Sequence, residues 1–187
     1  MARPLSCPVQ PCCVSSDRPD GSLTYGMPSV VHFQAATLEQ ISIARDLFQE
    51  YASALAIDLG IDLEYQGFAA ELAALPAPYE PPRGALFITY VDSAVAGCVA
   101  LRPLNDGTAE MKRLYVRPSY RSSGLGHYLV DAAIDAARQT GFPTLRLDTL
   151  ASMTSAQALY RKLGFIETAP YNDKHLPGTR FFSLALK

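Results

Sequence analysis

The run from Glu110 to Gly126 constrains the fold most, because it reads as a strand that passes into a helix through a glycine-rich loop. Residues 111–116 are apolar and aromatic enough for a strand, and Pro118 then ends backbone pairing. From Leu125 onward, apolar residues recur at helical spacing as far as Gly141, where a helix would end. The loop between strand and helix is therefore predicted to lie at a helix N-terminus.

A phosphate-binding site is predicted in this loop, which reads Arg121-Ser122-Ser123-Gly124-Leu125-Gly126. The first N–H groups of a helix lack intrahelical acceptors, and the helix dipole adds about half a positive charge beside them, so an anion is the expected ligand. Glycines at 124 and 126 let oxygen atoms approach the backbone, and the guanidinium of Arg121 suits a second phosphate. We predict that the loop binds a pyrophosphate.

Two common phosphate motifs do not fit the loop. A P-loop needs Gly-Lys-Ser/Thr, whereas His127 and Tyr128 follow Gly126 here. A dinucleotide fingerprint needs a third glycine, whereas Leu129 occupies that position, although Asp148 stands where an acidic residue would be expected. Hydrolysis of a nucleoside triphosphate and binding of a dinucleotide are therefore disfavoured.

The loop resembles the signature of the GNAT superfamily of acetyl-CoA-dependent N-acetyltransferases, in which Arg/Gln-x-x-Gly-x-Gly/Ala follows a strand that ends in Val-x-Pro. Here Val116-Arg117-Pro118 precedes the loop. A second similar block follows, with a predicted strand at 145–150 and then Ala156-Gln157-Ala158-Leu159-Tyr160-Arg161-Lys162-Leu163-Gly164-Phe165. The resemblance extends from Ser29 to the C-terminus.

The resemblance implies an α+β layered fold, the acyl-CoA N-acyltransferase fold. Its sheet is mixed, mostly antiparallel and twisted, with about six or seven strands and with helices on both faces. The chain offers matching patterns. Thr37 and Gln40 form a capping-box pattern before a helix, and Asp92-Ser93 and Asn105-Asp106-Gly107 mark turns. Further strands are predicted at 30–35, 85–91, 94–101, 144–149, 165–168 and 180–186, and further helices at 68–75 and 153–163.

Composition is consistent with a single domain over residues 27–187, because 49% of the 187 residues are hydrophobic and 18% are charged. Residues 1–26 are rich in proline and serine and lack periodicity, so we predict a disordered leader or an extension. A net charge of -2 gives no reason to expect a nucleic-acid partner. No apolar run is long enough to span a membrane and no secretory signal is visible, so cytoplasmic location is expected.

No metal site is predicted. Three of the four cysteines lie in the first 13 residues, and Cys98 falls in a predicted buried strand. His32, His127 and His175 have no ligand pattern around them. Free thiols are typical of a reducing compartment.

The resemblance also implies a route for the chemistry. The pantetheine arm of acetyl-CoA would lie between the central strand and its successor, against the backbone of Leu114 and Val116. Tyr160 matches a position that often carries a tyrosine near the sulfur, so it is the expected proton donor to the leaving thiolate. Glu110 matches a glutamate that often removes the amine proton, directly or through water. Its alternative role is an ion pair with Lys112 or Arg102.

Two positions depart from the family pattern. Met153 stands where many relatives have an asparagine that contacts pantetheine, so packing would hold the arm there. Ser122-Ser123 replaces the usual Gly-Lys or Gly-Arg, which should weaken phosphate affinity while leaving the backbone site.

The acceptor is not determined by the sequence. Cations for a substrate carboxylate are available at Arg83, Arg102, Lys112, Arg113, Lys174 and His175, and anions for a polyamine or an aminoglycoside at Asp58, Asp62 and Glu64. The primary amine of a small molecule or amino acid is the first expectation. The alternatives are a protein N-terminus or lysine, a non-catalytic CoA-binding sensor, and transfer of an acyl group other than acetyl, held near Cys98 and Leu114. A homodimer through the sheet edge or the C-terminal strand also remains open.

Overall fold

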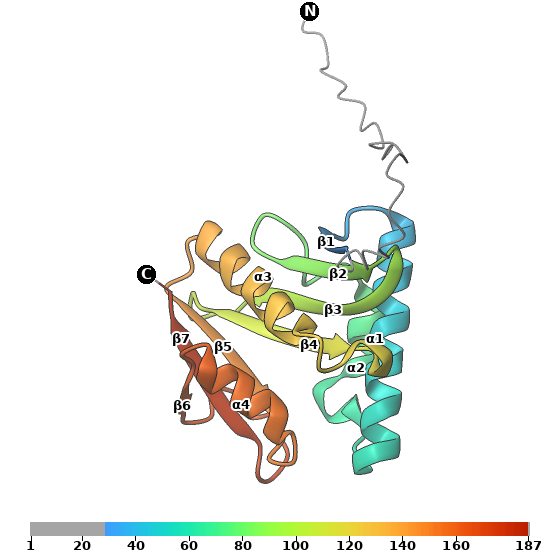
Figure 1. Ribbon diagram of the computed structural model, residues 1–187. Coiled ribbons are helices and arrows are strands. Elements are labelled where there is room, and N and C mark those ends of the chain that lie inside the picture. Colours follow the sequence, from blue (N-terminus) through green and yellow to red (C-terminus); the bar gives the residue numbers. More distant parts are fainter. Residues whose placement is uncertain (1–28, 187) are drawn as a thin grey trace, which may run out of the picture.

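The computed structural model describes residues 29–186, so the predicted leader lies outside the described residues. A seven-stranded sheet carries helices on both faces, which confirms the predicted fold class (Figure 1). In chain order the elements are β1 (Val30–Gln34), α1 (Leu38–Leu59), η1 (Leu63–Gln66), α2 (Phe68–Ala74), β2 (Ala85–Val91), β3 (Ala94–Pro103), β4 (Ala109–Val116), η2 (Pro118–Tyr120), α3 (Leu125–Gln139), β5 (Thr144–Thr149), α4 (Thr154–Lys162), β6 (Ile166–Thr168) and β7 (Arg180–Ala185).

Local signals in the sequence determine how α1 begins. The predicted capping box is present, because the backbone N–H of Gln40 donates to Thr37 Oγ1 at 3.2 Å and the N–H of Thr37 donates to Gln40 Oε1 at 3.1 Å. The helix ends at Gly60, whose φ of 66° is the left-handed conformation that glycine adopts without strain.

Three consecutive antiparallel strands, β2, β3 and β4, lead into the phosphate loop, as predicted. The turn between β2 and β3 is formed by Asp92 and Ser93, with φ of 48° and 68°. Two successive positive φ values are typical of the tight turn whose twist matches that of a hairpin. The hairpin joins β2 to β3, and β3 pairs in turn with β4, the strand on which the site is built.

The strands β4 and β5 diverge. They run parallel but pair only at Ala109 with Leu145 and at Glu110 with Arg146. Beyond these pairs the two strands separate, so the C-terminal half of β4 faces a gap (Figure 1). This is the opening that the resemblance implied for the pantetheine arm.

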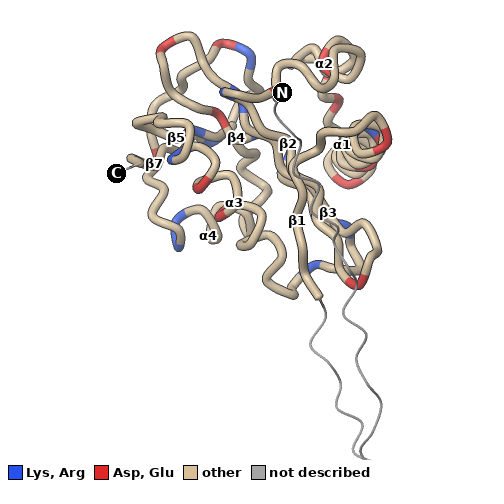
Figure 2. Tube along the Cα trace, turned by 90° about the horizontal axis from the view of Figure 1, so that it is seen from above, with Lys and Arg blue, Asp and Glu red and all other residues tan. Residues whose placement is uncertain are grey.

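Two layers of helices cover the sheet (Figure 2). Helices α3 and α4 pack on one face, over a core that includes Leu129, Leu145 and Phe182. Helices α1 and α2 pack on the other face, over a core that includes Phe48 and Ile88. Helices α1 and α3 each bury an apolar stripe against the strands, whereas α2 adds only the partly buried Phe68 and Leu72.

The strand order β1-β2-β3-β4-β5-β7-β6 makes β1 and β6 the edges of the sheet. The C-terminal strand β7 is paired on both sides, with β5 and with β6. A homodimer that extends the sheet would therefore use β1 or β6.

Within residues 29–186, no helix combines the length and the apolar character needed to cross a bilayer.

Candidate active site

The predicted phosphate loop lies at the start of α3. Its backbone turns through left-handed conformations at Ser122, with a φ of 63°, and at Gly124, with a φ of 87°. The first N–H of α3 with an acceptor in the preceding turn is that of Tyr128, which donates to Gly124 O at 3.2 Å. The N–H groups before it have no intrahelical acceptor, so they are available to an anion.

The side chains of the loop leave the backbone accessible. Arg121 folds back over the end of β4, where its Nε donates to Val116 O at 3.1 Å. Ser123 Oγ donates to Tyr120 O at 2.7 Å, which stabilises the turn. A Cβ added at Gly126 would meet only Leu159 Cδ2, at 3.6 Å, so the Cα of Gly126 is not crowded. The loop therefore fits a pyrophosphate, although Ser122 holds a backbone conformation that a glycine would adopt more readily.

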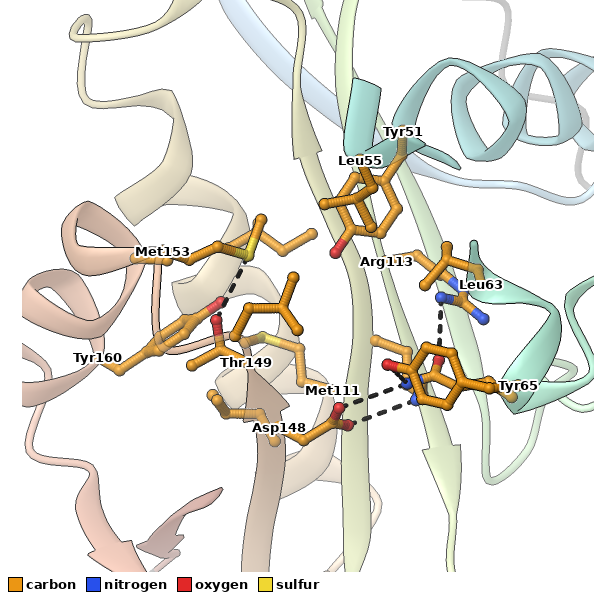
Figure 3. Close-up of a pocket in the computed structure, with 16 residues that line it drawn as sticks. Tyr51, Leu55, Leu63, Tyr65, Met111, Arg113, Asp148, Thr149, Met153 and Tyr160 are labelled. Atoms are coloured by element: carbon orange, nitrogen blue, oxygen red, sulfur yellow. Dashed lines mark hydrogen bonds and ion pairs between the residues drawn. The ribbon is translucent and has the colours of Figure 1, made fainter. Parts of the chain in front are cut away.

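A cavity of about 90 Å³ fills the gap between β4 and β5, and we call it the splay cavity (Figure 3). Its walls come from α1, η1, β4, β5 and α4. The lining residues are Tyr51, Leu55, Leu63, Tyr65, Gln66, Met111, Lys112, Arg113, Leu114, Leu147, Asp148, Thr149, Leu150, Met153, Ala156 and Tyr160. The structure thus brings Tyr160 and Leu114 together, whereas Val116 and Glu110 do not line this cavity.

Tyr160 projects from α4 into the splay cavity (Figure 3). Its ring packs against those of Phe165 and Phe182, at centroid distances of 5.8 and 6.0 Å. Burial raises the pKa of its phenol above 10, so the hydroxyl stays protonated at neutral pH. Met153 lies beside it, and Thr149 Oγ1 donates to Met153 Sδ at 3.5 Å.

Asp148 is the carboxylate that sequence reasoning missed as a site residue. It lies at the C-terminal end of β5 and shares the splay cavity with Tyr160 (Figure 3). Lys112 Nζ is 3.4 Å from Asp148 Oδ1, and Gln66 Nε2 is 3.5 Å from Asp148 Oδ2. An acidic residue at the end of an otherwise alternating strand was the available signal, but only the divergence of the strands brings it to the same cavity as Tyr160.

Glu110 is enclosed by partners. Its side chain is 1% exposed, and Oε2 accepts from Arg102 Nε at 2.7 Å and lies 2.6 Å from Arg102 Nη2. Its Oε1 accepts from the hydroxyl of Tyr171 at 2.9 Å, and Lys112 Nζ is 3.9 Å away. This geometry realises the ion pair that the sequence left as the alternative to a base.

A second cavity, of about 130 Å³, adjoins the first and shares Gln66 and Lys112 with it. Residues of the β6–β7 loop form one of its walls. The lining residues are Gln66, Glu71, Arg102, Leu104, Glu110, Lys112, Tyr171, Asn172 and Lys174. Glu110 therefore belongs to the wall of this second cavity.

A buried ion pair holds β4 in place between the cavities and α2. Arg113, whose φ of 56° marks an irregularity in the strand, donates through Nε to Glu71 Oε1 at 2.8 Å and through Nη2 to Glu71 Oε2 at 2.5 Å. Its Nη1 donates to Gln66 Oε1 at 3.2 Å. Burial by itself would raise the pKa of Glu71, but the hydrogen bonds and charge of Arg113 outweigh it and lower that pKa.

The expectation of an acyl pocket near Cys98 and Leu114 is wrong in one respect. Cys98 is fully buried in the core on the α1 face and lines neither cavity. Its Sγ donates to Arg113 O at 3.4 Å, and burial raises the pKa of its thiol. Side-chain alternation along β3 places this thiol on the side of the sheet away from α3.

Buried tyrosines should make the protein sensitive to alkali. Burial raises the pKa of Tyr51 to about 12 and those of Tyr79, Tyr160 and Tyr171 above their ordinary value. The unfolded chain releases these protons near pH 10, so above that pH it binds fewer protons than the folded state. The free energy of unfolding should then fall by up to roughly 1.4 kcal/mol per pH unit for each such tyrosine.

Urea unfolding at pH 8, 9, 10 and 11 measures this dependence. Stability should be flat to about pH 10 and then decline. In Tyr51→Phe the free energy of unfolding should fall less steeply above pH 10, by about 1.4 kcal/mol per pH unit, because one fewer proton is released on unfolding. A slope identical to that of the parent would contradict the assignment.

Proteins of known family resemble this chain. A family model described as the acetyltransferase (GNAT) family matches residues 44–165. An uncharacterised N-acetyltransferase of Schizosaccharomyces pombe is 35% identical over 162 residues, which cover 85% of this chain and 97% of that protein. A GNAT acetyltransferase structure from Staphylococcus aureus superposes with a TM-score of 0.69 at 20% identity, over 85% of this chain and all 100% of that one. A structure of Salmonella typhimurium yncA with its cofactor acetyl-CoA gives 0.60 at 19% identity, over 84% and 94% of the two chains.

Proposed function

The chain belongs to the GNAT family of acetyltransferases and is an N-acetyltransferase, and from this we propose that it moves an acetyl group from acetyl-CoA directly to a primary amine of a small molecule or amino acid. The observation that carries the proposal is the divergence of β4 and β5, with the phosphate loop after β4 and Tyr160 on the cavity wall. The acetyl-CoA in the similar Salmonella structure supports the choice of cosubstrate.

The phosphate loop and the splay cavity would hold the two ends of acetyl-CoA. The unpaired N–H groups of the loop and the guanidinium of Arg121 suit the pyrophosphate, and the backbone of Leu114 suits the pantetheine arm. Space beside Gly126 supports this fit. Acetyl-CoA supplies a thioester, whose carbonyl carbon accepts the nitrogen of the amine.

Proton transfers are assigned to two groups in the splay cavity. An alkylamine has a pKa of about 10 and must lose a proton to attack, so an acceptor is needed. When the carbon–sulfur bond breaks, the sulfur leaves as a thiolate, and Tyr160 is placed to donate its hydroxyl proton. The raised pKa of Tyr160 keeps its hydroxyl protonated across the neutral range, and it also makes the phenol a weaker acid toward the thiolate.

Asp148 and Glu110 compete for the role of proton acceptor. Asp148 shares a cavity with Tyr160, and its two partners are 3.4 and 3.5 Å away. Glu110 is tied to Arg102 and Tyr171 and would have to act through water. We propose Asp148 as the group that receives the ammonium proton, while the role of Glu110 as a base stays a prediction.

Three conservative variants test these roles. Tyr160→Phe should lower kcat by roughly 10- to 100-fold, toward the lower end of general acid–base effects, because a thiolate leaves readily. Asp148→Asn should lower kcat/KM for the amine by a similar factor and steepen its rise with pH, whereas Glu110→Gln should change it less. Steady-state release of free CoA measures all three. A larger effect of Glu110→Gln than of Asp148→Asn would reverse the assignment.

Calorimetry separates the enzyme from a non-catalytic sensor. All three variants should bind acetyl-CoA with the parent affinity, and a sensor would show that binding without turnover of any amine. The small volumes of the two cavities, about 90 and 130 Å³, support a small acceptor over a polypeptide.

Cytoplasmic location, the absence of a nucleic-acid or membrane partner, and a homodimer stay predictions.

A further inference from the structure

We infer that the acceptor carries a carboxylate in addition to its amine, and that this carboxylate binds in the second cavity, between Arg102, Lys112 and Lys174. The inference rests on the proposed function, because it assumes that an amine is acetylated in the splay cavity. It follows from which charged groups of the second cavity are already paired and which retain free hydrogen-bonding capacity.

Both carboxylates of the second cavity are engaged at each of their oxygens by donors of the protein. Both oxygens of Glu110 are engaged, by Arg102 and by Tyr171. Both oxygens of Glu71 accept from Arg113, and Oε1 also accepts from the hydroxyl of Tyr79 at 2.7 Å. A cationic ligand would have to displace one of these close contacts, so the cavity offers little to a second ammonium group.

The cations of the same cavity keep donors to spare. Arg102 uses Nε and Nη2 on one oxygen of Glu110, and its side chain is 31% exposed. Lys112 Nζ stands 3.4 Å from Asp148 and 3.9 Å from Glu110, beyond the roughly 2.7–2.9 Å of a charge-assisted hydrogen bond. Lys174 is exposed and pairs with no carboxylate among residues 29–186. The lining of the second cavity therefore sets Arg102, Lys112 and Lys174 against two carboxylates that already have partners, which suits one added carboxylate.

Lys112 links the two cavities, and its position explains how one ligand would span them. It lines both, and it is the closest cation to Asp148. An amine that approaches Asp148 would take the place of Lys112 beside that carboxylate. Lys112 would then be free to turn to the carboxylate of the same ligand, so amine and carboxylate would bind on opposite sides of Lys112.

Four of the other charged groups that the sequence offered are engaged elsewhere. Arg113 is paired with Glu71, and the guanidinium of Arg83 lies over Phe142, 4.9 Å from the ring centre. Asp62 Oδ1 accepts from the N–H of Glu64, and Glu64 Oε2 accepts from the N–H of Ala69 at 3.0 Å. Asp62 and Glu64 therefore each accept a backbone N–H at the start of a short helix.

Matched acceptors test the inference on the whole chain. The probes are glycine, β-alanine and γ-aminobutyrate, together with the L-α-amino acids, each compared with its own carboxamide by initial rates of CoA release. The carboxamide keeps the shape and removes the charge. Its amine is also less basic, so more of it is neutral at a given pH, and a preference for the acid would run against this bias. We expect kcat/KM to favour the acid by at least about tenfold for the best chain length.

Lys174 provides the test by mutation. Lys174→Gln should raise KM for the best acid by roughly tenfold, the equivalent of about 1.4 kcal/mol, and leave KM for acetyl-CoA and for the carboxamide unchanged. Lys162→Gln, the same change at an exposed position outside both cavities, should leave all three values unchanged. Lys174→Glu should shift the preference toward a diamine such as putrescine.

The outcomes distinguish this inference from the proposed function. If calorimetry detects no acetyl-CoA binding, the proposed function fails. If acetyl-CoA binds and carboxamides or simple amines react as well as the acids, or if no acid reacts at all, the acetyl-CoA site stands and the carboxylate site is overturned. An equal rise in KM for acid and carboxamide in Lys174→Gln would also overturn it, because a charge-specific contact cannot produce that pattern.

Discussion

Gly126→Glu is expected to reduce the affinity for acetyl-CoA by at least about 100-fold. A carboxylate introduced on the first turn of α3 would lie beside the pyrophosphate. At about 5 Å and an effective dielectric constant of about 20, two unit charges repel by roughly 3 kcal/mol. A hundredfold change in a dissociation constant corresponds to about 2.7 kcal/mol, so even one phosphate charge supplies the effect.

A substitution at position 126 reports the effect of an added charge with less distortion of the loop backbone than a substitution at position 124. Gly124 holds a φ of 87°, so any replacement there strains the loop, whereas Gly126 lies within α3 and a Cβ would make only an ordinary contact with Leu159. Gly126→Ala should bind nearly as the parent does, and Gly126→Gln reports the effect of bulk without charge. Calorimetry with acetyl-CoA measures all of them. Equal affinities for the Glu and Gln variants would contradict pyrophosphate binding at this loop.

Glu71→Ala is expected to lower the free energy of unfolding by about 3–5 kcal/mol, because it leaves the guanidinium of Arg113 buried without a counter-charge. The side chains of Glu71 and Arg113 are 9% and 3% exposed. The substitution also removes the partner of the hydroxyl of Tyr79, which is itself buried. Urea unfolding of the parent and the variant measures the loss.

The chain contains a matched control for this prediction. Arg117, which follows β4, makes a similar ion pair with Glu50 of α1. Its Nη2 and Nε lie 2.6 and 2.9 Å from the two carboxylate oxygens of Glu50. These side chains are 34% and 38% exposed, so the pair is much less buried. Glu50→Ala should therefore cost only about 0–1 kcal/mol. Adding Arg113→Met to Glu71→Ala should recover part of the stability, since it removes the unpaired charge. Equal losses for Glu50→Ala and Glu71→Ala would show that burial does not control the contribution of these pairs.

Local patterns in the sequence were enough to predict most of the fold. The capping box at Thr37, the two-residue turn at Asp92-Ser93 and the apolar spacing after Leu125 act over a few residues, and each produced the expected element. Boundaries differ by one or two residues, as at the start of β6, where Ile166 rather than residue 165 is the first paired residue. The phosphate loop was predictable for the same reason, because glycines and a helix start determine its backbone locally.

Only the tertiary structure determined which charged side chains meet. Asp148, Lys112 and Tyr160 come from β5, β4 and α4, and the divergence of β4 and β5 places them around one cavity. The same packing separates Glu110 from Tyr160 and pairs it with Arg102. Sequence spacing determines hydrogen bonds within a helix or turn, but a contact between side chains far apart in the chain depends on strand order and on the angle between strands. The sequence by itself therefore determined the strand–loop–helix unit, whereas the composition of the cavity walls was decided by how seven strands pack.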